Sequence, residues 1–276
     1  MKTAAMIIVL LFGALLAYAA LDFPPWGDPS APASVHVSPH YIEQTLSQTS
    51  VPNIVTAVLA DYRGYDTLFE TIVIFSAGVA CLFLMRVFRR IEPESRMYRH
   101  LPSGITLRVA KGYAPPPESQ EFERIDLTWV PYNLVVKTTS RLIVPFSQLF
   151  ALYVIAHGHH SPGGGFQGGV ILGASIVLFA IATNMRASLA RFNEKRAVAL
   201  CVLGVLIYTA TGALCMLLGA NYLDYGALAT LFGGDRIAAR SHGILMVEIG
   251  VGITVMAVMV HLYYSLASSG RHDEGL

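Results

Sequence analysis

Residues 71–85, TIVIFSAGVACLFLM, contain no charged side chain and lie between Glu70 and Arg86. A helix needs about 20 mainly apolar residues to cross a bilayer core of about 30 Å at about 1.5 Å per residue. With its flanks, this stretch is a candidate membrane span over about 66–88. Comparable apolar stretches cover about 4–21, 131–156, 166–186, 196–219 and 242–266. We therefore expect an all-α integral membrane protein with about six transmembrane helices.

The composition agrees with a membrane environment. Apolar residues make up 54% of the 276 residues and charged residues 13%, whereas a soluble domain has about 25% charged residues. The net charge of +1 gives no reason to expect nucleic acid as a partner. The three cysteines, Cys81, Cys201 and Cys215, lie in apolar stretches without a C-x-x-C pair, so neither disulfides nor a zinc site is expected. No cofactor pattern is present, and we expect none.

The lysines and arginines that flank the spans predict the orientation. Fourteen fall on one side and three on the other, with Lys137 and Arg141 set aside because they lie within the third span. Basic residues favour the cytoplasmic side, so both termini are expected to be cytoplasmic in a multi-pass protein of the cell (inner) membrane. The first span also has features of a secretory signal, but we expect it to be a retained anchor.

The chain divides into two pieces. Residues 1–90 would hold two spans and an external loop over 22–50, which is rich in Pro, Ser and Thr and reads as irregular. Within residues 41–62 we expect a short helix that lies on the membrane or dips into it. A charged connector over 91–129 contains three consecutive prolines and is expected to be cytoplasmic. Residues 130–270 would form a four-span domain.

Ionisable residues within membrane spans are functional candidates, because an unpaired charge in hydrocarbon is costly. The first such cluster consists of Asp61, Arg63, Asp66, Thr67 and Glu70. Asp66 and Glu70 are four apart and Arg63 and Asp66 are three apart, which places them on one helical face. A carboxylate there can bind and release a proton or Na⁺ when desolvation moves its pKa towards the working pH. The alternative is a structural ion pair that orients the start of the helix.

A second cluster lies at the start of the third span. Lys137 and Arg141 share one helical face, and Pro145 just beyond them predicts a possible kink. One interpretation is a buried cation that modulates a proton path. The alternative is that the two side chains snorkel towards the cytoplasmic head groups.

A third feature is the segment HGHHSPGGGFQGG over 157–169. It formally contains G-x-G-x-x-G, but it joins two membrane spans and lacks the strand and amphipathic helix of a dinucleotide site. Its histidines have no carboxylate or thiol nearby in sequence, which disfavours a metal. His157 and His159 are candidates for the ion path, because histidine titrates near neutral pH. A mechanical role fits the remaining motif residues, since small residues let spans approach closely: Pro162, Gly163, Gly164, Gly165, Gly168 and Gly169.

The sixth span adds Glu248, which lies a few residues into the hydrocarbon from the outer side and is a further ion-path candidate. His261, near the cytoplasmic end, is expected to be structural. Asp224, Asp235 and Arg240 fall in the loop before this span and are expected to be solvated.

Two of these motifs together resemble a known family. The segment 157–169 resembles the signature of the B subunit of Mrp-type Na⁺/H⁺ antiporters, and the likeness extends over about 130–265, including Arg141 and Pro145. The stretch 55–70 is similar to the end of the Mrp A subunit and to the small E-like subunit of membrane-bound hydrogenases related to complex I. That likeness covers about 50–88, with Phe69 where the family usually has glycine.

The resemblance implies an accessory, non-enzymatic membrane subunit of a multi-subunit Na⁺/H⁺ antiporter, with the other subunits as partners and Na⁺ and H⁺ as transported ions. Glu70 would then sit on a cation or proton route. Two alternatives stay open, namely the equivalent subunit of a hydrogenase-type or complex I-related respiratory complex and a purely structural membrane subunit. An independent transporter built from repeats is disfavoured, because two and four spans are not equal halves.

Overall fold

The computed structural model describes residues 2–87, 95–110, 121–124, 134–183 and 185–268. The chain forms two compact units, residues 1–45 and 46–276. The first contains helix α1 (Lys2–Ala19), a short 3-10 turn (Ala20–Asp22), a π-helical segment (Ala33–Val37) and most of helix α2 (Ser38–Thr49). The expectation of an irregular segment over 22–50 is therefore wrong for its second half.

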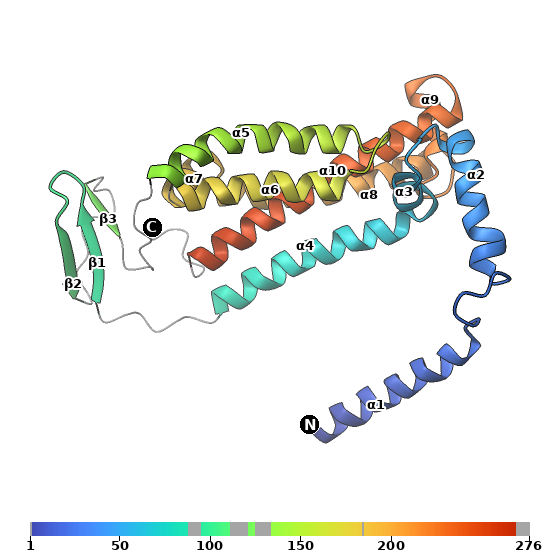
Figure 1. Ribbon diagram of the computed structural model, residues 1–276, viewed down its shortest axis with the longest axis horizontal. Coiled ribbons are helices and arrows are strands. Elements are labelled where there is room, and N and C mark those ends of the chain that lie inside the picture. The colour runs from blue at the N-terminus through green and yellow to red at the C-terminus, as the bar shows by residue number, and fades with distance from the viewer. Residues whose placement is uncertain (1, 88–94, 111–120, 125–133, 184, 269–276) are drawn as a thin grey trace. The chain divides into compact units, whose positions relative to one another are not determined.

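The second unit is a helix bundle (Figure 1). Its long central helix, α10, packs against α4, α6 and α8, while α5 packs against α6. Most residues of α10 are buried, so it forms the core of this unit. The helical elements, in chain order, are α3 (Ile54–Ala57), the π-helical segment η3 (Val58–Tyr62), α4 (Gly64–Val87), α5 (Leu134–Ala156), α6 (Gly165–Ala182), α7 (Met185–Arg191), α8 (Glu194–Leu217), the 3-10 segment η4 (Tyr225–Leu228), α9 (Ala229–Phe232) and α10 (Arg236–Ala267).

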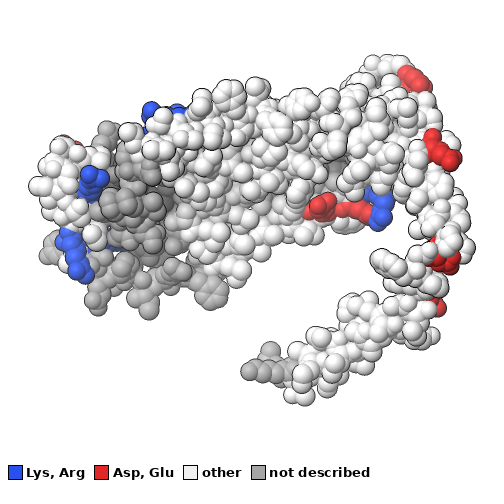
Figure 2. Space-filling view, viewed as in Figure 1, with Lys and Arg blue, Asp and Glu red and all other residues white. Residues whose placement is uncertain are grey.

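Six helices are long and apolar enough to cross a membrane, namely α1, α4, α5, α6, α8 and α10. The prediction of an all-α protein with about six transmembrane helices is confirmed, and the chain is a multi-pass protein of the cell membrane. In the space-filling view, the middle of the bundle is almost free of charge (Figure 2). The cytoplasmic placement of both termini stays a prediction.

The connector contains a small antiparallel sheet that the sequence analysis did not anticipate. Strand β1 (Ser95–His100) lies between β2 (Thr106–Ala110) and β3 (Phe122–Arg124). The three consecutive prolines of the connector lie outside the described residues. The proposed division at 1–90, 91–129 and 130–270 stays a prediction.

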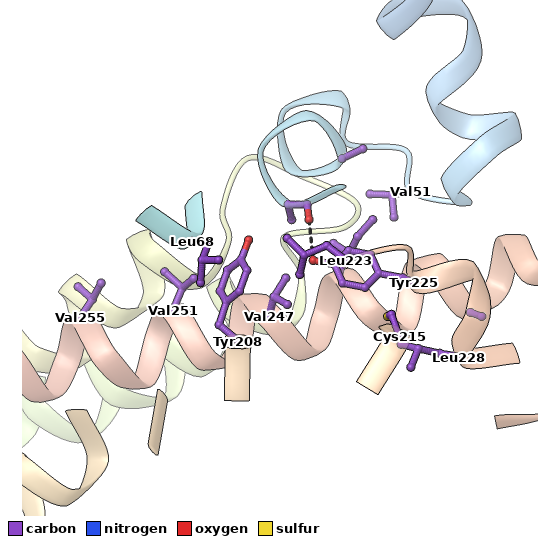
Figure 3. Packing of buried hydrophobic residues seen from close by; sticks show 14 residues of the cluster. Val51, Leu68, Tyr208, Cys215, Leu223, Tyr225, Leu228, Val247, Val251 and Val255 are labelled. Atoms are coloured by element: carbon purple, nitrogen blue, oxygen red, sulfur yellow. Dashed lines mark hydrogen bonds between the residues drawn. The ribbon is translucent and has the colours of Figure 1, made fainter. Parts of the chain in front are cut away.

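A cluster of buried side chains joins α4, α8, α10 and the segments that precede α4 (Figure 3). Leu68, Tyr208 and Val251 belong to it. Glycines let α6 approach α10, because a Cβ built on Gly169 would lie 2.6 Å from the carbonyl oxygen of Gly252. Bare backbone contact of this kind is how membrane helices pack without a hydrophobic driving force.

Candidate functional site

Three segments that are distant in sequence meet at one end of the bundle, and we call their meeting point the junction. They are residues 53–63, the loop 157–164 and the N-terminal part of α10. Asn53 caps α3, since its Oδ1 accepts the N–H of Val55 at 3.1 Å. Its Nδ2 donates to the carbonyls of Gly158 at 2.7 Å and Ser161 at 2.8 Å. Thr56, within the stretch 55–70, also donates from its hydroxyl to the carbonyl of Gly158 at 2.8 Å, so the two motifs that carry the family resemblance are bonded directly to one another.

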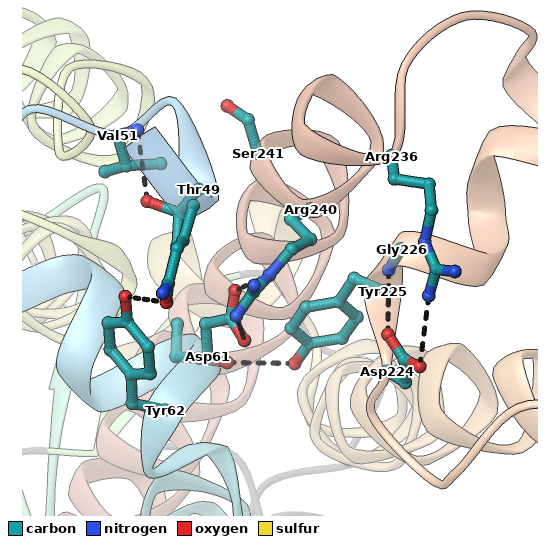
Figure 4. A network of polar contacts seen from close by, with 12 residues as sticks. Thr49, Val51, Asp61, Tyr62, Asp224, Tyr225, Gly226, Arg236, Arg240 and Ser241 are labelled. Carbon is teal, nitrogen blue, oxygen red and sulfur yellow. Dashed lines mark hydrogen bonds and ion pairs between the residues drawn. The ribbon is translucent and has the colours of Figure 1, made fainter. Parts of the chain in front are cut away.

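The same junction binds α10 through an ion pair. Arg240 donates from Nε to Oδ2 of Asp61 at 2.7 Å and from Nη2 to Oδ1 at 2.9 Å, as the close-up shows (Figure 4). The Asp61 side chain is only 8% exposed and that of Arg240 26% exposed. The expectation that Arg240 is solvated is therefore wrong, because α10 begins at Arg236 and presents Arg240 to Asp61. Because two parallel hydrogen bonds join the guanidinium of Arg240 to the carboxylate of Asp61, the two charges can be buried together.

Two tyrosines satisfy backbone carbonyls of the segment that leads into α4. The hydroxyl of Tyr225 donates to the carbonyl of Ala60 at 3.0 Å, and that of Tyr208 donates to the carbonyl of Gly64 at 2.8 Å. Burial raises the pKa of Tyr225 well above its ordinary value, so its hydroxyl stays protonated and remains a donor. Nearby, Asp224 pairs with Arg236 at 3.6 Å (Figure 4), so Asp224 is also not simply solvated.

His159 and Glu248 form a buried pair in the junction. Nδ1 of His159 lies 3.5 Å from Oε2 of Glu248, and the two side chains are about a tenth exposed. The other ring nitrogen, Nε2, lies 3.0 Å from the carbonyl oxygen of Ser241. A carbonyl can only accept, so Nε2 carries a hydrogen and donates it.

This arrangement makes the pair a place for one proton. With Nε2 protonated, Nδ1 and Oε2 attract each other only when a proton sits on one of them, since two lone pairs would otherwise face each other. The carboxylate of Glu248 raises the pKa of His159, which outweighs the opposing effect of burial. The pair can therefore hold a proton in largely buried surroundings.

The glycine-rich loop is folded around the Glu248 carboxylate. A Cβ on Gly164 would lie 2.8 Å from Oε1 of Glu248, and the φ of Gly164 is +126°, a conformation that other residues rarely adopt. A Cβ on Gly165 would lie 2.0 Å from the carbonyl oxygen of Glu248, and one on Gly168 would lie 2.8 Å from the carbonyl oxygen of Ala151 in α5. These glycines let three helices meet around one carboxylate.

The carboxylates of α4 have different surroundings. Arg63 donates from Nε to Asp66 at 2.6 Å, so the ion pair at the start of this helix exists, with the two side chains 60% and 54% exposed. Glu70 is exposed on the same side of α4. The opposite side is buried through Leu68 and Gly78, and a Cβ on Gly78 would lie 3.1 Å from Cγ1 of Val258 in α10.

The cluster predicted over 61–70 is therefore split. Asp61 points into the junction, while Arg63, Asp66 and Glu70 lie on the exposed side of α4. The hydroxyl of Thr67 donates to the carbonyl of Leu59 at 2.8 Å, so this side chain ties α4 to the preceding π-helical segment. Asp61 lies in the π-helical turn η3, which ends at Arg63 with φ −120° and ψ 35°, so the regular i, i+4 spacing of α4 does not continue back to Asp61.

The remaining candidates lie apart from the junction pair. His157 stacks on Tyr153, with 4.9 Å between ring centroids, instead of reaching Glu248. Pro162 is exposed at the tip of the loop. Lys137 and Arg141 line a pocket of about 530 Å³ far along α5 from the loop, and Arg141 is exposed rather than buried. Pro145, within α5, lines the same pocket without interrupting the helix.

The sequence analysis missed several residues of the junction. It did not foresee that Arg240 binds Asp61, that Asn53 binds the histidine loop, or that His159 faces Glu248. An arginine next to an apolar span and an asparagine at a helix cap were available signals. Their partners were not, because pairing across the fold leaves no mark in a single sequence.

Comparisons with known proteins agree with this architecture. A family described as "Domain related to MnhB subunit of Na+/H+ antiporter" matches residues 135–261, and the MbhE family, described as the E subunit of MBH, matches residues 3–99. The Methanocaldococcus jannaschii protein MJ1307 is 29% identical over 82% of this chain and 80% of its own length. A Staphylococcus aureus (strain Newman) protein assigned as antiporter subunit mnhB2 is 28% identical over 50% of this chain and 96% of its own length.

Two solved structures share the fold. A chain of the membrane-bound sulfane sulfur reductase, an archaeal respiratory membrane complex, matches with a TM-score of 0.56 and 23% identity, covering 96% of this chain and 97% of that chain. A chain of the Mrp complex from Dietzia sp. DQ12-45-1b matches with a TM-score of 0.54 and 23% identity, covering 95% of this chain and 26% of that chain.

The fold and the matched regions define a multi-pass membrane subunit of an antiporter module. More particularly, the chain is an MbhE-like and MnhB-like subunit, with the two regions in that order in one polypeptide. Its partners are the other subunits of such a complex.

Proposed function

We propose that this chain is an accessory subunit of an Mrp-type Na⁺/H⁺ antiporter, in which it lines the ion path and has no catalytic site of its own. The observation that carries this proposal is the position of Glu70. It lies in a membrane-spanning helix, on the side turned away from α10, and it is exposed. A carboxylate facing lipid at that depth is costly. A neighbouring subunit therefore covers it, and ions pass beside this chain at that contact.

The exposed acidic pair strengthens this interpretation. Asp66 and Glu70 are four residues apart on α4, and Arg63 neutralises Asp66 but has no bond to Glu70 among the contacts of the described residues. Carboxylate oxygen is a suitable ligand for Na⁺ and also carries a proton, so one residue can serve both ions. Phe69, also exposed, stands beside Glu70 where the contact with the neighbouring subunit would form.

The junction supplies a second element of the proposed path. The His159–Glu248 pair holds a proton within the chain, whereas Glu70 meets its ions at the surface. Both lie towards the same end of the bundle, because residues 53–63 connect the junction directly to α4. In this proposal the buried pair sets the protonation of the region next to the ion route.

The test is Glu70→Gln, which removes the charge and keeps the shape. In everted membrane vesicles we expect the variant to lose Na⁺-dependent proton antiport by at least tenfold, with the complex still assembled on blue-native electrophoresis. Asp235→Asn is the matched control, since Asp235 is an exposed carboxylate just outside α10. Wild-type antiport in Glu70→Gln would refute a direct role. Loss of antiport only in proportion to loss of assembly would instead support a purely structural subunit.

The equivalent place in a respiratory complex is the second candidate. It is favoured by length, because the matched chain of the sulfane sulfur reductase complex corresponds to this chain end to end, whereas the matched Mrp chain is covered to only 26%. Purification of the parent complex in mild detergent separates the two. Co-purifying iron–sulfur or nickel subunits would support the respiratory complex, and a complex without metal centres would support the stand-alone antiporter.

A further inference from the structure

A pocket of about 530 Å³ lies between α5, α6 and α7, remote from the junction and from Glu70. Its described lining contains three basic side chains, Lys137, Arg141 and Arg191, and no acidic one. Lys137 and Arg141 are four residues apart on α5, so they project from the same side about one helical turn, or about 6 Å, from each other. Basic side chains therefore line more than one wall of the pocket.

The third cation is held in place by an aromatic ring. The guanidinium carbon of Arg191, in the last turn of α7, lies 4.5 Å from the centroid of the Phe179 ring in α6. Such stacking uses one face of the guanidinium and leaves its N–H groups at the edge available for an anion. Thr183, at the end of α6, also lines the pocket.

The position of the pocket along the bundle selects the kind of anion. It extends from the start of α5 and the end of α6 into the first half of α5, so its basic end lies near the ends of two membrane spans, close to the level of the head groups. This is the end at which most lysines and arginines of the chain gather, and basic residues mark the cytoplasmic side. Figure 2 shows basic side chains on the otherwise uncharged surface at the start of α5. The walls between the cations, Val144, Pro145 and Ala187, are apolar or small.

We propose that this pocket binds the phosphate of an anionic phospholipid, with Lys137, Arg141 and Arg191 around the head group and the acyl chains along the exposed side of α5. That side is apolar, and Leu142, Phe146 and Leu149 are each more than 60% exposed. Basic pockets between helices on the cytoplasmic side suit such head groups. Pro145 contributes as well, because it lacks the N–H that would otherwise bond the carbonyl of Arg141 and so loosens the helix at that residue.

The experiment is a lipid titration of the full-length chain, purified in detergent and stripped of lipid, read by native mass spectrometry. Phosphatidylglycerol and phosphatidylcholine are the probes. We expect phosphatidylglycerol to bind preferentially, and the double variant Lys137→Gln/Arg141→Gln to weaken it by about 30-fold. That factor equals about 2 kcal/mol at about 1.4 kcal/mol per tenfold, or about 1 kcal/mol for each basic residue. Binding of phosphatidylcholine should not change.

Lys195→Gln is the matched control, because Lys195 is exposed at the same end but does not line the pocket. An equal loss in this control would refute a defined site and indicate diffuse attraction. Displacement of phosphatidylglycerol by millimolar inorganic phosphate would assign the pocket to a soluble anion and overturn the lipid proposal. Loss of co-purifying subunits from the parent complex of the double variant, with bound lipid unchanged, would assign the pocket to a protein partner instead.

Discussion

The junction and the exposed side of α4 both present carboxylates at one end of the bundle, but the carboxylates of the junction are buried and those of α4 are exposed. Asp61 and Glu248 are buried and have partners within the chain, Arg240 and His159. Asp66 and Glu70 are exposed, although they follow Asp61 by only a few residues. A buried charge must be compensated where it lies, so the junction is complete within this chain. In the proposed function, the exposed side of α4 is covered by another subunit.

The largest expected effect tests how tightly the junction is closed. In Gly165→Ala the new Cβ would meet the carbonyl oxygen of Glu248 at 2.0 Å, a backbone atom that cannot give way. We expect a cost above the roughly 1–3 kcal/mol typical of overpacking, and a strong loss of monodisperse protein in size-exclusion chromatography. Gly13→Ala is the control, since nothing lies within 4 Å of its built Cβ. Wild-type yield from Gly165→Ala would mean that α6 and α10 are not in this close contact.

A smaller effect is expected when the two ion pairs that involve this motif, Asp61–Arg240 and Asp66–Arg63, are broken one at a time. Arg240→Gln leaves Asp61 buried without its partner and should cost about 3 kcal/mol. Arg63→Gln removes a pair whose side chains are 60% and 54% exposed, and should cost less than about 1 kcal/mol. Thermal unfolding in detergent measures both. The double variant Asp61→Asn/Arg240→Gln should be more stable than Arg240→Gln alone. Equal losses in Arg240→Gln and Arg63→Gln would contradict the distinction between buried and exposed pairs.

The smallest effect is a pH dependence that belongs to the junction alone. Glu248 raises the pKa of His159 above its ordinary value of 6.5. The stabilisation by the charged pair is therefore fully present below about pH 6.5 and is lost as the pH rises through the higher pKa of the folded state. We expect the stability advantage of the wild type over Glu248→Gln to shrink in that direction.

The measurement is the melting temperature of both proteins across a pH series in one detergent. His242→Gln serves as the control, because His242 is on the exposed side of α10, where its Nδ1 lies 2.7 Å from the carbonyl oxygen of Ala238. The difference in melting temperature between His242→Gln and the wild type should not follow the same pH profile. An advantage of the wild type over Glu248→Gln that grows with rising pH would contradict a shared proton in the pair.

The predictions from sequence succeeded where the signal is local. Six apolar stretches were found because hydropathy is read over one helix at a time, and the family resemblance rests on two contiguous motifs. The small sheet of the connector was missed, and helix α2 was anticipated only in part, by the short helix expected within 41–62, since short elements in polar segments have little hydropathy pattern. Arg240 was misjudged for a related reason. Its position before an apolar span suggested solvent, and only the fold brings Asp61 to it.

The amino-acid sequence by itself determined that the chain crosses the membrane, about where each helix lies and which family motifs it carries, because these depend on residues close together in the chain. The tertiary structure decided which carboxylates are buried and which are exposed. Asp61 and Glu70 share one motif and look equivalent in the sequence. However, Asp61 belongs to the π-helical turn and reaches Arg240, whereas Glu70 belongs to α4, beyond the end of that turn at Arg63, and lies at the surface. The protonation of a carboxylate depends on such surroundings, so its role follows from the fold.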